Sequence, residues 1–359
     1  MSCESISSSV KWLIDNHGGL AILSGNILVP SQFTEHDILE KTFDIIHDAQ
    51  FKTNDGSDTL SFVPNDLPPN QMPLRYVIYY PPKDDEKGTD AHNDQECILY
   101  HNPNGVMLYD YFDKDTYELT GVPKFLCDTL KCPIILYDYR GTGMNYDALN
   151  RDFSSLSSQF VHPTYKTIID DGMYMLKTAL EKFQHVKIAG SSLGGAVATI
   201  SLYNILHKQS HDDYDEYEKT KSRIDWLFNH DSFTTTTKVA FPSLGMIGNL
   251  VITIIGAHLD AETAMKKLIE NYRIYVKVYC TLKDPVIPKE ARMLNCVNCL
   301  NGEMDIITSD YYGHASFHPN AKEYLTICLK NKKTGLGYLH HRKRYVVSET
   351  EMGISEAKW

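Results

Sequence analysis

One serine stands in a setting where a side chain could act as a nucleophile. The segment GSSLG, residues 190–194, follows a short apolar run, VKIA, and precedes a stretch with helical periodicity. A tight strand-to-helix turn needs glycine two residues before and two residues after the serine, because larger side chains would meet the strand and the helix. Ser191 would have Ala189 and Leu193 at those positions, so the spacing selects Ser192 as the nucleophile.

An acid and a base that could activate this serine follow it in the chain. Asp284 stands in TLKDPVIP after the apolar run IYVKVYC, and His314 stands in YYGHA after the run MDIIT. A serine hydroxyl is a weak nucleophile, so His314 would take its proton and later return it to the leaving group. Asp284 would hold the imidazole in one tautomer and stabilise its charged form. The order Ser192, Asp284, His314 predicts acyl transfer through a covalent serine intermediate.

Two neighbours compete for these roles. His318 is the alternative base and Asp310 the alternative acid. Gly313 would let the backbone at His314 approach closely, whereas His318 and the proline after it look like the entrance to a helix over 320–329. The sequence therefore favours His314. A plain turn aspartate before a proline remains the alternative interpretation of Asp284.

Two backbone N–H groups are expected to stabilise the oxyanion of such a reaction. Leu193 follows the nucleophile and supplies the first. The second should come from the loop YHNPNGVM after the apolar run CILY. Pro103 has no N–H, so Asn104 is the candidate, with Gly105 and Val106 behind it. An ordinary Asn-Gly turn is the alternative interpretation.

Short apolar runs alternate with helical stretches along most of the chain. Near-continuous apolar strands alternating with helices predict an α/β fold with a mostly parallel sheet covered on both faces. Residues 284 and 314 each come just past a predicted strand, where the loops of an open α/β sheet build their sites. The strands are expected at 75–80, 97–100, 133–137, 186–189, 226–228, 274–280 and 304–308, and the two longest helices at 165–183 and 196–206.

Three regions fall outside this alternation. Residues 1–73 hold one helical stretch, 35–49, and a proline-rich connector, which indicates an N-terminal extension or small subdomain. Residues 208–223 are polar and acidic, which predicts a solvated surface loop. Residues 331–359 form a polar C-terminal tail with few apolar groups to anchor it. A single catalytic domain is therefore expected over 74–330.

Taken together, these motifs resemble the α/β-hydrolase superfamily of serine hydrolases. The resemblance rests on GSSLGG, on LYDYRGTG at 136–143, on KDPVIP at 283–288 and on GH at 313–314, and it spans about residues 74–330. It implies an α/β-hydrolase fold, with a mostly parallel central sheet flanked by helices. The segment HDSF at 230–233 resembles depalmitoylase-like members and uncharacterised members from intracellular bacteria, which implies a cap-like segment at about 235–270. The usual HG pair of the oxyanion loop is replaced by HNPNG.

The longest uncharged stretch, residues 239–257, favours a lipid-like or acyl substrate. It is nearly as long as the roughly 20 residues that cross a bilayer. Because it contains proline and several glycines, a buried helix or an apolar cap is the preferred interpretation, and peripheral membrane contact is the alternative.

Composition narrows the remaining classes. A chain of 359 residues with 42% hydrophobic and 23% charged residues is typical of a globular protein. Its net charge of −11 disfavours nucleic acid as a partner. Eight cysteines are too sparse for a disulfide framework, and the CxxC at 296–299 lacks further zinc ligands, so we expect no metal and no cofactor. The first residues lack the pattern of a signal peptide, which predicts a cytoplasmic, reducing compartment.

The sequence thus predicts a serine hydrolase that cleaves a carboxylic ester or thioester through an acyl-enzyme on Ser192. An acyltransferase or a peptidase would use the same three residues. A binding protein on a hydrolase scaffold, with a protein partner docked on residues 1–73 or on the acidic insertion, is an alternative from another class. Glu349, Glu351 and Glu356 resemble the tail signals of proteins that bacteria inject into host cells, so a translocated effector is a further alternative.

Overall fold

The computed structural model of the chain describes the greater part of the predicted catalytic segment. Residues 35–49, residues 240–257 and the glutamates at 349, 351 and 356 lie outside the described residues, and so do the predictions made for them. The described residues are 60–63, 74–81, 95–113, 116, 118–140, 142, 145, 165–239, 258–331 and 342–347.

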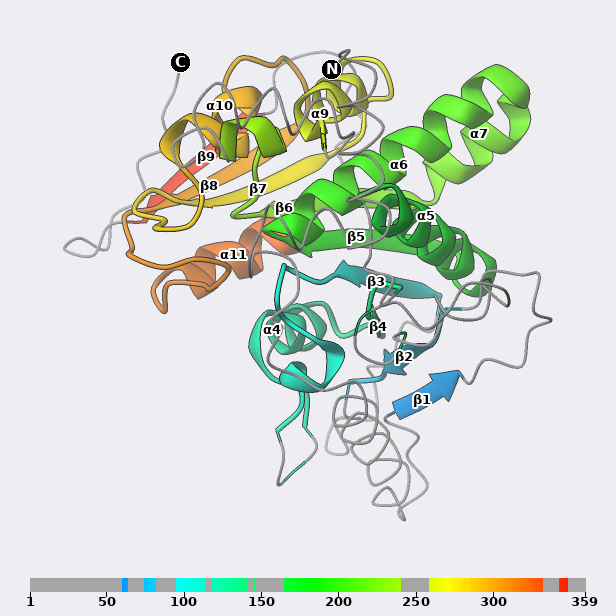
Figure 1. The fold of residues 1–359 in the computed structure, drawn as a ribbon, viewed down its shortest axis with the longest axis horizontal. Helices are drawn as coiled ribbons and strands as arrows, with labels where there is room; N and C mark the ends of the chain where they lie inside the picture. The colour runs from blue at the N-terminus through cyan, green and yellow to red at the C-terminus, as the bar shows by residue number, and fades with distance from the viewer. Residues whose placement is uncertain are drawn as a thin grey trace, which may run out of the picture.

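A sheet of nine strands runs through the centre of the described structure (Figure 1). The strand order is β1-β2-β4-β3-β5-β6-β7-β8-β9. Strand β2 is antiparallel to both of its neighbours, and every pair from β4 to β9 is parallel. The strands are β1 (Leu60–Val63), β2 (Tyr76–Tyr79), β3 (Glu96–His101), β4 (Ile134–Tyr137), β5 (His185–Ser191), β6 (Ile224–His230), β7 (Val276–Thr281), β8 (Met304–Ser309) and β9 (Arg342–Val347).

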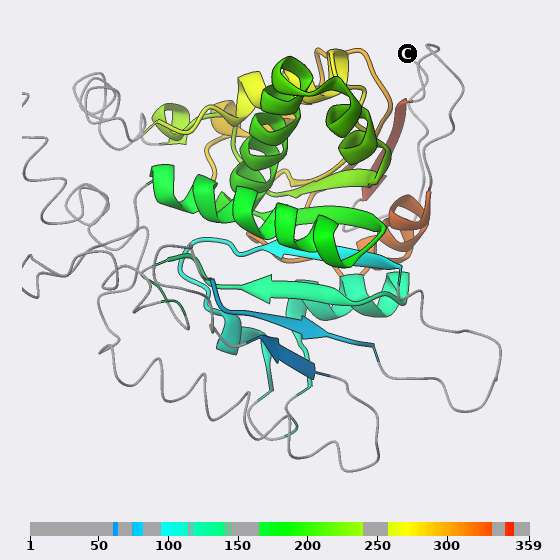
Figure 2. The same ribbon diagram turned by 90° about the vertical axis from the view of Figure 1, so that its right-hand side faces the viewer.

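Helices cover both faces of this sheet, as buried strands on a parallel sheet require. On one face α5, α6, α9 and α10 pack over one large apolar cluster. On the other face α4 and α11 pack over a second cluster. Figure 2 shows α5, in bright green, lying along the strands. The helices are α4 (Gly121–Leu130), α5 (Tyr165–Lys182), α6 (Leu193–Asp212), α7 (Tyr214–Ser222), α9 (Ala261–Glu270), α10 (Met293–Val297) and α11 (Ala321–Lys330), with short 3-10 turns η1 (Leu108–Tyr111) and η3 (Lys289–Ala291).

The predicted fold class is confirmed, and so are the elements that carry it. Each of the seven predicted strands is present as one of β2 to β8, with ends that differ by a few residues. The helix expected at 165–183 is α5. The helix expected at 196–206 is the middle of α6, which begins directly after Ser192.

The surface loop predicted at 208–223 is wrong, because this stretch is helical. Helix α6 continues to Asp212, and α7 follows after a single residue. Asp213 caps α7 by accepting a hydrogen bond from the backbone N–H of Glu216 at 3.1 Å. Acidic residues in the first turn and lysines in the last turn suit the helix dipole. Tyr217 is the one buried apolar side chain of the helix, so its polar composition concealed it.

The sheet is wider than the predicted catalytic segment 74–330. Strand β9 lies in the region predicted as a polar tail and pairs with β8 along its whole length. Over residues 344–347 the side chains alternate, and Tyr345 and Val347 are buried in the cluster under α4 and α11. At the other edge β1 pairs with β2. Both edge strands therefore come from residues outside the predicted segment.

In the part of the chain that the structure describes, no helix combines the length and the apolar character needed to cross a membrane. The described cysteines are all free thiols. Among the same residues, no three His, Cys, Asp or Glu side chains gather in a way that could hold a metal ion. Cys296 is buried and Cys299 is exposed.

Candidate active site

Ser192 is the single residue between the end of β5 and the start of α6. Its backbone has φ 52° and ψ −119°, a strained conformation for a residue with a side chain. The glycines around it have no room for a Cβ. A Cβ at Gly190 would lie 2.3 Å from the carbonyl oxygen of Gly194, and one at Gly194 would lie 2.0 Å from the carbonyl oxygen of His101. The turn therefore needs glycine on both sides of Ser192.

Three loops at the carboxyl ends of β5, β7 and β8 bring Ser192, Asp284 and His314 together. Nε2 of His314 lies 2.9 Å from Oγ of Ser192. Nδ1 of His314 lies 2.7 Å from Oδ2 of Asp284. The Asp284 side chain is only 2% exposed, and that of His314 is 18% exposed. The hydroxyl, the imidazole and the carboxylate thus form one chain of hydrogen bonds that reaches the surface at the histidine.

Asp284 also holds its own loop. Its Oδ1 accepts hydrogen bonds from the backbone N–H groups of Val286 at 2.7 Å and Ile287 at 3.0 Å. Arg292, which sequence reasoning missed, donates to the carbonyl oxygens of Leu282 at 2.6 Å and Asp284 at 3.2 Å. The turn interpretation of Asp284 and a role in orienting His314 are therefore compatible, because each uses a different oxygen.

The rival residues have other partners. The backbone N–H of His318 donates to the hydroxyl of Tyr279 at 3.2 Å, and its Nδ1 accepts from the backbone N–H of Asn320 at 3.1 Å. His318 thus organises the turn that leads into α11. Asp310 forms an ion pair with Lys283 at 3.2 Å, and both side chains are about half exposed.

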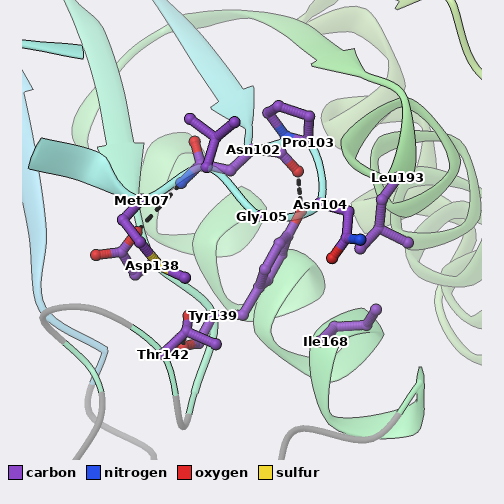
Figure 3. A pocket seen from close by; sticks show the side chains of 11 residues that line it. Asn102, Pro103, Asn104, Gly105, Met107, Asp138, Tyr139, Thr142, Ile168 and Leu193 are labelled. Atoms are coloured by element: carbon purple, nitrogen blue, oxygen red, sulfur yellow. Dashed lines mark hydrogen bonds between the residues drawn. The ribbon is translucent and has the colours of Figure 1, made fainter. Parts of the chain in front are cut away.

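Asn104 and Leu193 line the same pocket (Figure 3). The loop after β3 lies against the start of α6, because a Cβ at Gly194 would meet the carbonyl oxygens of residues 101 and 102. The hydroxyl of Tyr139 donates to the carbonyl oxygen of Asn102 at 3.0 Å. The Asn102 side chain donates to the carbonyl oxygen of Tyr137 at 2.7 Å. These contacts hold the loop of Asn104 beside the elbow.

An ion pair fixes the loop after β4, which forms another wall of the pocket. The backbone N–H and Nε of Arg140 donate to the two oxygens of Asp171 at 2.8 Å and 3.0 Å. The Asp171 side chain is fully buried in α5. Burial raises the pKa of Asp171 to about 6, and the nearby Arg140 opposes this shift. The motif DYRGTG thus shapes the wall through its arginine.

A buried chain of hydrogen bonds lies directly behind the elbow. Oγ of Ser191 accepts from the hydroxyl of Tyr100 at 2.9 Å and lies 2.7 Å from Nδ1 of His230. Because Tyr100 donates to Ser191, the serine proton is available to His230. Nε2 of His230 lies 3.3 Å from Oδ2 of Asp231 but makes no hydrogen bond to it, so the chain of hydrogen bonds ends at His230. Ser191 and His230 are fully buried and Asp231 is 3% exposed, so this second serine, histidine and aspartate cannot meet a substrate.

This buried chain is joined to the backbone of the site. The N–H of Ser192 donates to the carbonyl oxygen of His230 at 2.8 Å. Asp231, at φ 44°, accepts from the backbone N–H of Thr281 at 2.6 Å, three residues before Asp284. Sequence reasoning used HDSF only for a family resemblance and missed this role. Ser191, a polar residue at the buried end of a strand, is the signal that could have found it.

The strand order and the elbow together decide the fold. Among the described strands only β2 runs against the others, helices cover both faces, and a serine at a strained turn joins β5 to the helix behind it. This is the arrangement in which a nucleophile elbow stands at the top of an α/β-hydrolase sheet. The chain has the α/β-hydrolase fold.

Comparison with known proteins finds similarity to solved structures of low sequence identity. No family model matches the chain, and no curated protein matches it. Acetyl xylan esterase 1 from Thermoanaerobacterium sp. is 12% identical over 83% of this chain and 98% of its own, with a TM-score of 0.44. Est1E from Butyrivibrio proteoclasticus, with ferulic acid bound, is 14% identical over 75% and 96%, with a TM-score of 0.45. Mouse alpha/beta hydrolase domain-containing protein 10 is 13% identical over 75% and 95%, with a TM-score of 0.44.

Proposed function

We propose that this protein is a serine hydrolase that cleaves a carboxylic ester or thioester through an acyl-enzyme on Ser192. The observation that carries the proposal is the chain of hydrogen bonds from Ser192 through His314 to Asp284 at the elbow of the α/β-hydrolase fold. A hydroxyl held 2.9 Å from an imidazole that is itself held by a carboxylate is the arrangement that activates a serine.

The first half of the reaction forms the acyl-enzyme. Nε2 of His314 takes the hydroxyl proton as Oγ of Ser192 attacks the carbonyl carbon of the substrate. Oδ2 of Asp284 accepts a hydrogen bond from the Nδ1–H group of the imidazole and stabilises its positive form. The backbone N–H groups of Leu193 and Asn104 donate to the oxyanion of the tetrahedral intermediate. The intermediate collapses when His314 passes its proton to the leaving alcohol or thiol.

The second half releases the acid. His314 removes a proton from a water molecule, which attacks the carbonyl carbon of the acyl-enzyme. The new tetrahedral intermediate uses the same two N–H donors. Its collapse breaks the bond to Oγ of Ser192, which regains a proton from His314. The products are a carboxylic acid and the free enzyme.

A fluorophosphonate probe tests the nucleophile directly. We expect the probe to label the wild-type protein and Ser210→Ala, whose hydroxyl lies on the exposed end of α6. We expect no labelling of Ser192→Ala. Labelling that persists in Ser192→Ala would contradict the proposal. Loss of partner binding or cellular effect in Ser192→Ala would in turn argue against a purely binding role for the scaffold.

The length of the acyl group is open to a second measurement. The lipid-like substrate predicted from residues 239–257 stays a prediction, because residues 240–257 lie outside the described part of the chain. p-Nitrophenyl esters of graded chain length, with Ser192→Ala as the blank, measure the preference. A lipid-like substrate predicts that kcat/KM is highest for acyl chains of about eight or more carbons. Each methylene that the enzyme buries should contribute about 0.8 kcal/mol of transfer free energy.

A further inference from the structure

The acyl group of the proposed reaction is assigned to the pocket beside Leu193, the residue that follows Ser192 and supplies an oxyanion donor in that reaction. Four segments line it: the loop after β3, the loop after β4, α5 and the start of α6. Ile168, Val106 and Leu193 give it an apolar lining. Asn104 lies on its wall between the ring of Tyr139 and Leu193 (Figure 3).

The amide oxygen of Asn104 has no hydrogen-bond partner among the described residues, and it is shielded from solvent. A second shielded amide oxygen on the same pocket, Oδ1 of Asn102, is also without a partner there, and Asn102 is only 1% exposed. A buried acceptor that stays unpaired is costly, whereas a ligand that donates to it recovers that cost. Two such acceptors on residues that line one pocket therefore favour a substrate with a hydrogen-bond donor.

The neighbouring carboxylate argues for a neutral donor. Asp138 is buried on the same pocket, which disfavours an anionic acyl group. Its Oδ1 already accepts from the backbone N–H of Leu108 at 2.8 Å and from Nδ2 of Asn102 at 3.3 Å. Its charge is thus partly balanced by fixed donors, so a cationic ligand is not needed to satisfy it.

We infer that the substrate is an ester of a hydroxy acid, and that the acyl hydroxyl donates a hydrogen bond to Oδ1 of Asn104. This inference rests on the proposed function and deepens it. The apolar lining from Ile168 and Leu193 receives the carbon chain, and the amide of Asn104 reads the hydroxyl. Specificity arises because an acyl group without a donor leaves the shielded amide oxygen unpaired.

Isosteric p-nitrophenyl esters distinguish the effect of the acyl hydroxyl from the effects of acyl size and shape. Both enantiomers of the 2- and 3-hydroxybutanoates are compared with the 2- and 3-methylbutanoates, in which a methyl group replaces the hydroxyl. Each kcat/KM is divided by the rate constant of alkaline hydrolysis, which removes intrinsic reactivity. We expect at least one hydroxy ester to exceed its methyl isostere by about tenfold or more, the range that follows from an unpaired buried acceptor.

Variants test whether the preference for hydroxy esters depends on Asn104. In Asn104→Leu, and in Asn104→Ala if the leucine variant folds poorly, the hydroxy-to-methyl ratio should fall to about one or below. Thr142→Val is the matched control, because the Thr142 hydroxyl on the same pocket already donates to the carbonyl oxygen of Tyr139 at 2.7 Å. The wild-type ratio should persist in Thr142→Val. A tenfold ratio that survives in both Asn104 variants would overturn the role of Asn104.

The outcomes separate this inference from the proposed function. If no ester is hydrolysed in a Ser192-dependent reaction, the proposed serine hydrolase itself is overturned. If esters are hydrolysed but every hydroxy-to-methyl ratio of kcat/KM is near or below one, only the inference of a hydroxy acid is overturned. Faster hydrolysis of the matching 3-aminobutanoate ester than of the 3-hydroxybutanoate ester would also overturn it, in favour of a cationic acyl group.

Discussion

Asp284 divides its two carboxylate oxygens between structure and chemistry. Oδ1 accepts two backbone N–H groups of its own turn, and Oδ2 faces Nδ1 of His314. A carboxylate held in this way cannot rotate away from the imidazole without breaking the turn. The tautomer of His314, and with it the acceptor nitrogen that faces Ser192, therefore depends on a single side chain.

Replacing Asp284 tests this dependence. Asp284→Asn keeps an oxygen for the turn but can present N–H to His314, which favours the wrong tautomer. We expect kcat for ester hydrolysis to fall by about 10³–10⁴-fold, while the melting temperature changes by only a few degrees. His318→Gln is the control and should keep kcat within about threefold, at a stability cost of about 1 kcal/mol for the weakened turn. A greater loss in His318→Gln than in Asp284→Asn would identify the other histidine as the base.

His101 makes stability depend on pH. It is fully buried, and burial lowers its pKa from 6.5 to about 3. Between those values the unfolded chain binds a proton that the folded chain excludes. The contribution of neutral His101 to stability is therefore complete above about pH 6.5 and is lost as the pH falls toward 3.

Urea unfolding at two pH values measures this effect. For the His101 contribution alone we expect the free energy of unfolding to be lower by about 2 kcal/mol at pH 5 than at pH 7. His101→Gln removes the titrating group and should reduce the difference between the two pH values by that amount. His211→Gln, an exposed histidine on α6, should leave the difference as in the wild type. Equal pH dependence in His101→Gln and the wild type would contradict the assignment.

At the scale of elements, the elbow is held from behind by β6. His230 accepts the N–H of Ser192 through its backbone and binds Ser191 through its ring. The same ring stacks on Phe317, at 4.5 Å between centroids, and Phe317 belongs to the loop of His314. One buried side chain thus contacts both the nucleophile turn and the histidine loop, which makes it a positioning residue.

His230→Phe removes the ring nitrogens and keeps the aromatic stacking. Since misplacement of about 1 Å costs up to about a hundredfold, we expect kcat to fall by tenfold or more with KM nearly unchanged. The shape of the kcat/KM profile against pH should be unchanged. Tyr100→Phe, which leaves the contact between Ser191 and His230 in place, should lose less. A rise in KM that matches the fall in kcat would point to a role in binding instead.

For the whole molecule, the last strand matters more than its polar composition indicates. Strand β9 covers the edge of β8, the strand that precedes the loop of His314. Tyr345 is buried and stacks on Tyr324 of α11 at 6.4 Å between centroids. An uncovered β8 edge would present unpaired backbone groups to other chains.

Shortening the side chain of Tyr345 tests this role. Tyr345→Ala should lower the free energy of unfolding by about 3 kcal/mol, as expected for a buried aromatic residue. Val346→Ala, on the half-buried face of the same strand, should cost about 1 kcal/mol. A chain that ends at residue 341 should aggregate, although it keeps Ser192, Asp284 and His314. Wild-type solubility and stability of that truncated chain, by light scattering and urea titration, would contradict a structural role for β9.

Sequence patterns were informative where local physics decides the structure. The apolar runs of β2 to β8 and the periodicity of α5 follow from burial, which acts on each segment by itself. The polar helix α7 and the strand β9 were missed because each is anchored by one or two apolar side chains, Tyr217 in the helix and Tyr345 and Val347 in the strand. Their partners lie far away in the sequence, so no local pattern predicts them.

The sequence by itself determined strands β2 to β8, helices α5 and α6, their order along the chain and the turn that exposes Ser192, because glycine spacing and apolar periodicity are local properties of the chain. Only the tertiary structure decided that Asp284 and His314 meet at Ser192, that His318 belongs to the turn before α11, and that Ser191, His230 and Asp231 lie behind the elbow. These contacts join strands that are distant in the chain and adjacent in the sheet. Strand order and loop packing create these contacts, and neither can be predicted from any single segment of the sequence.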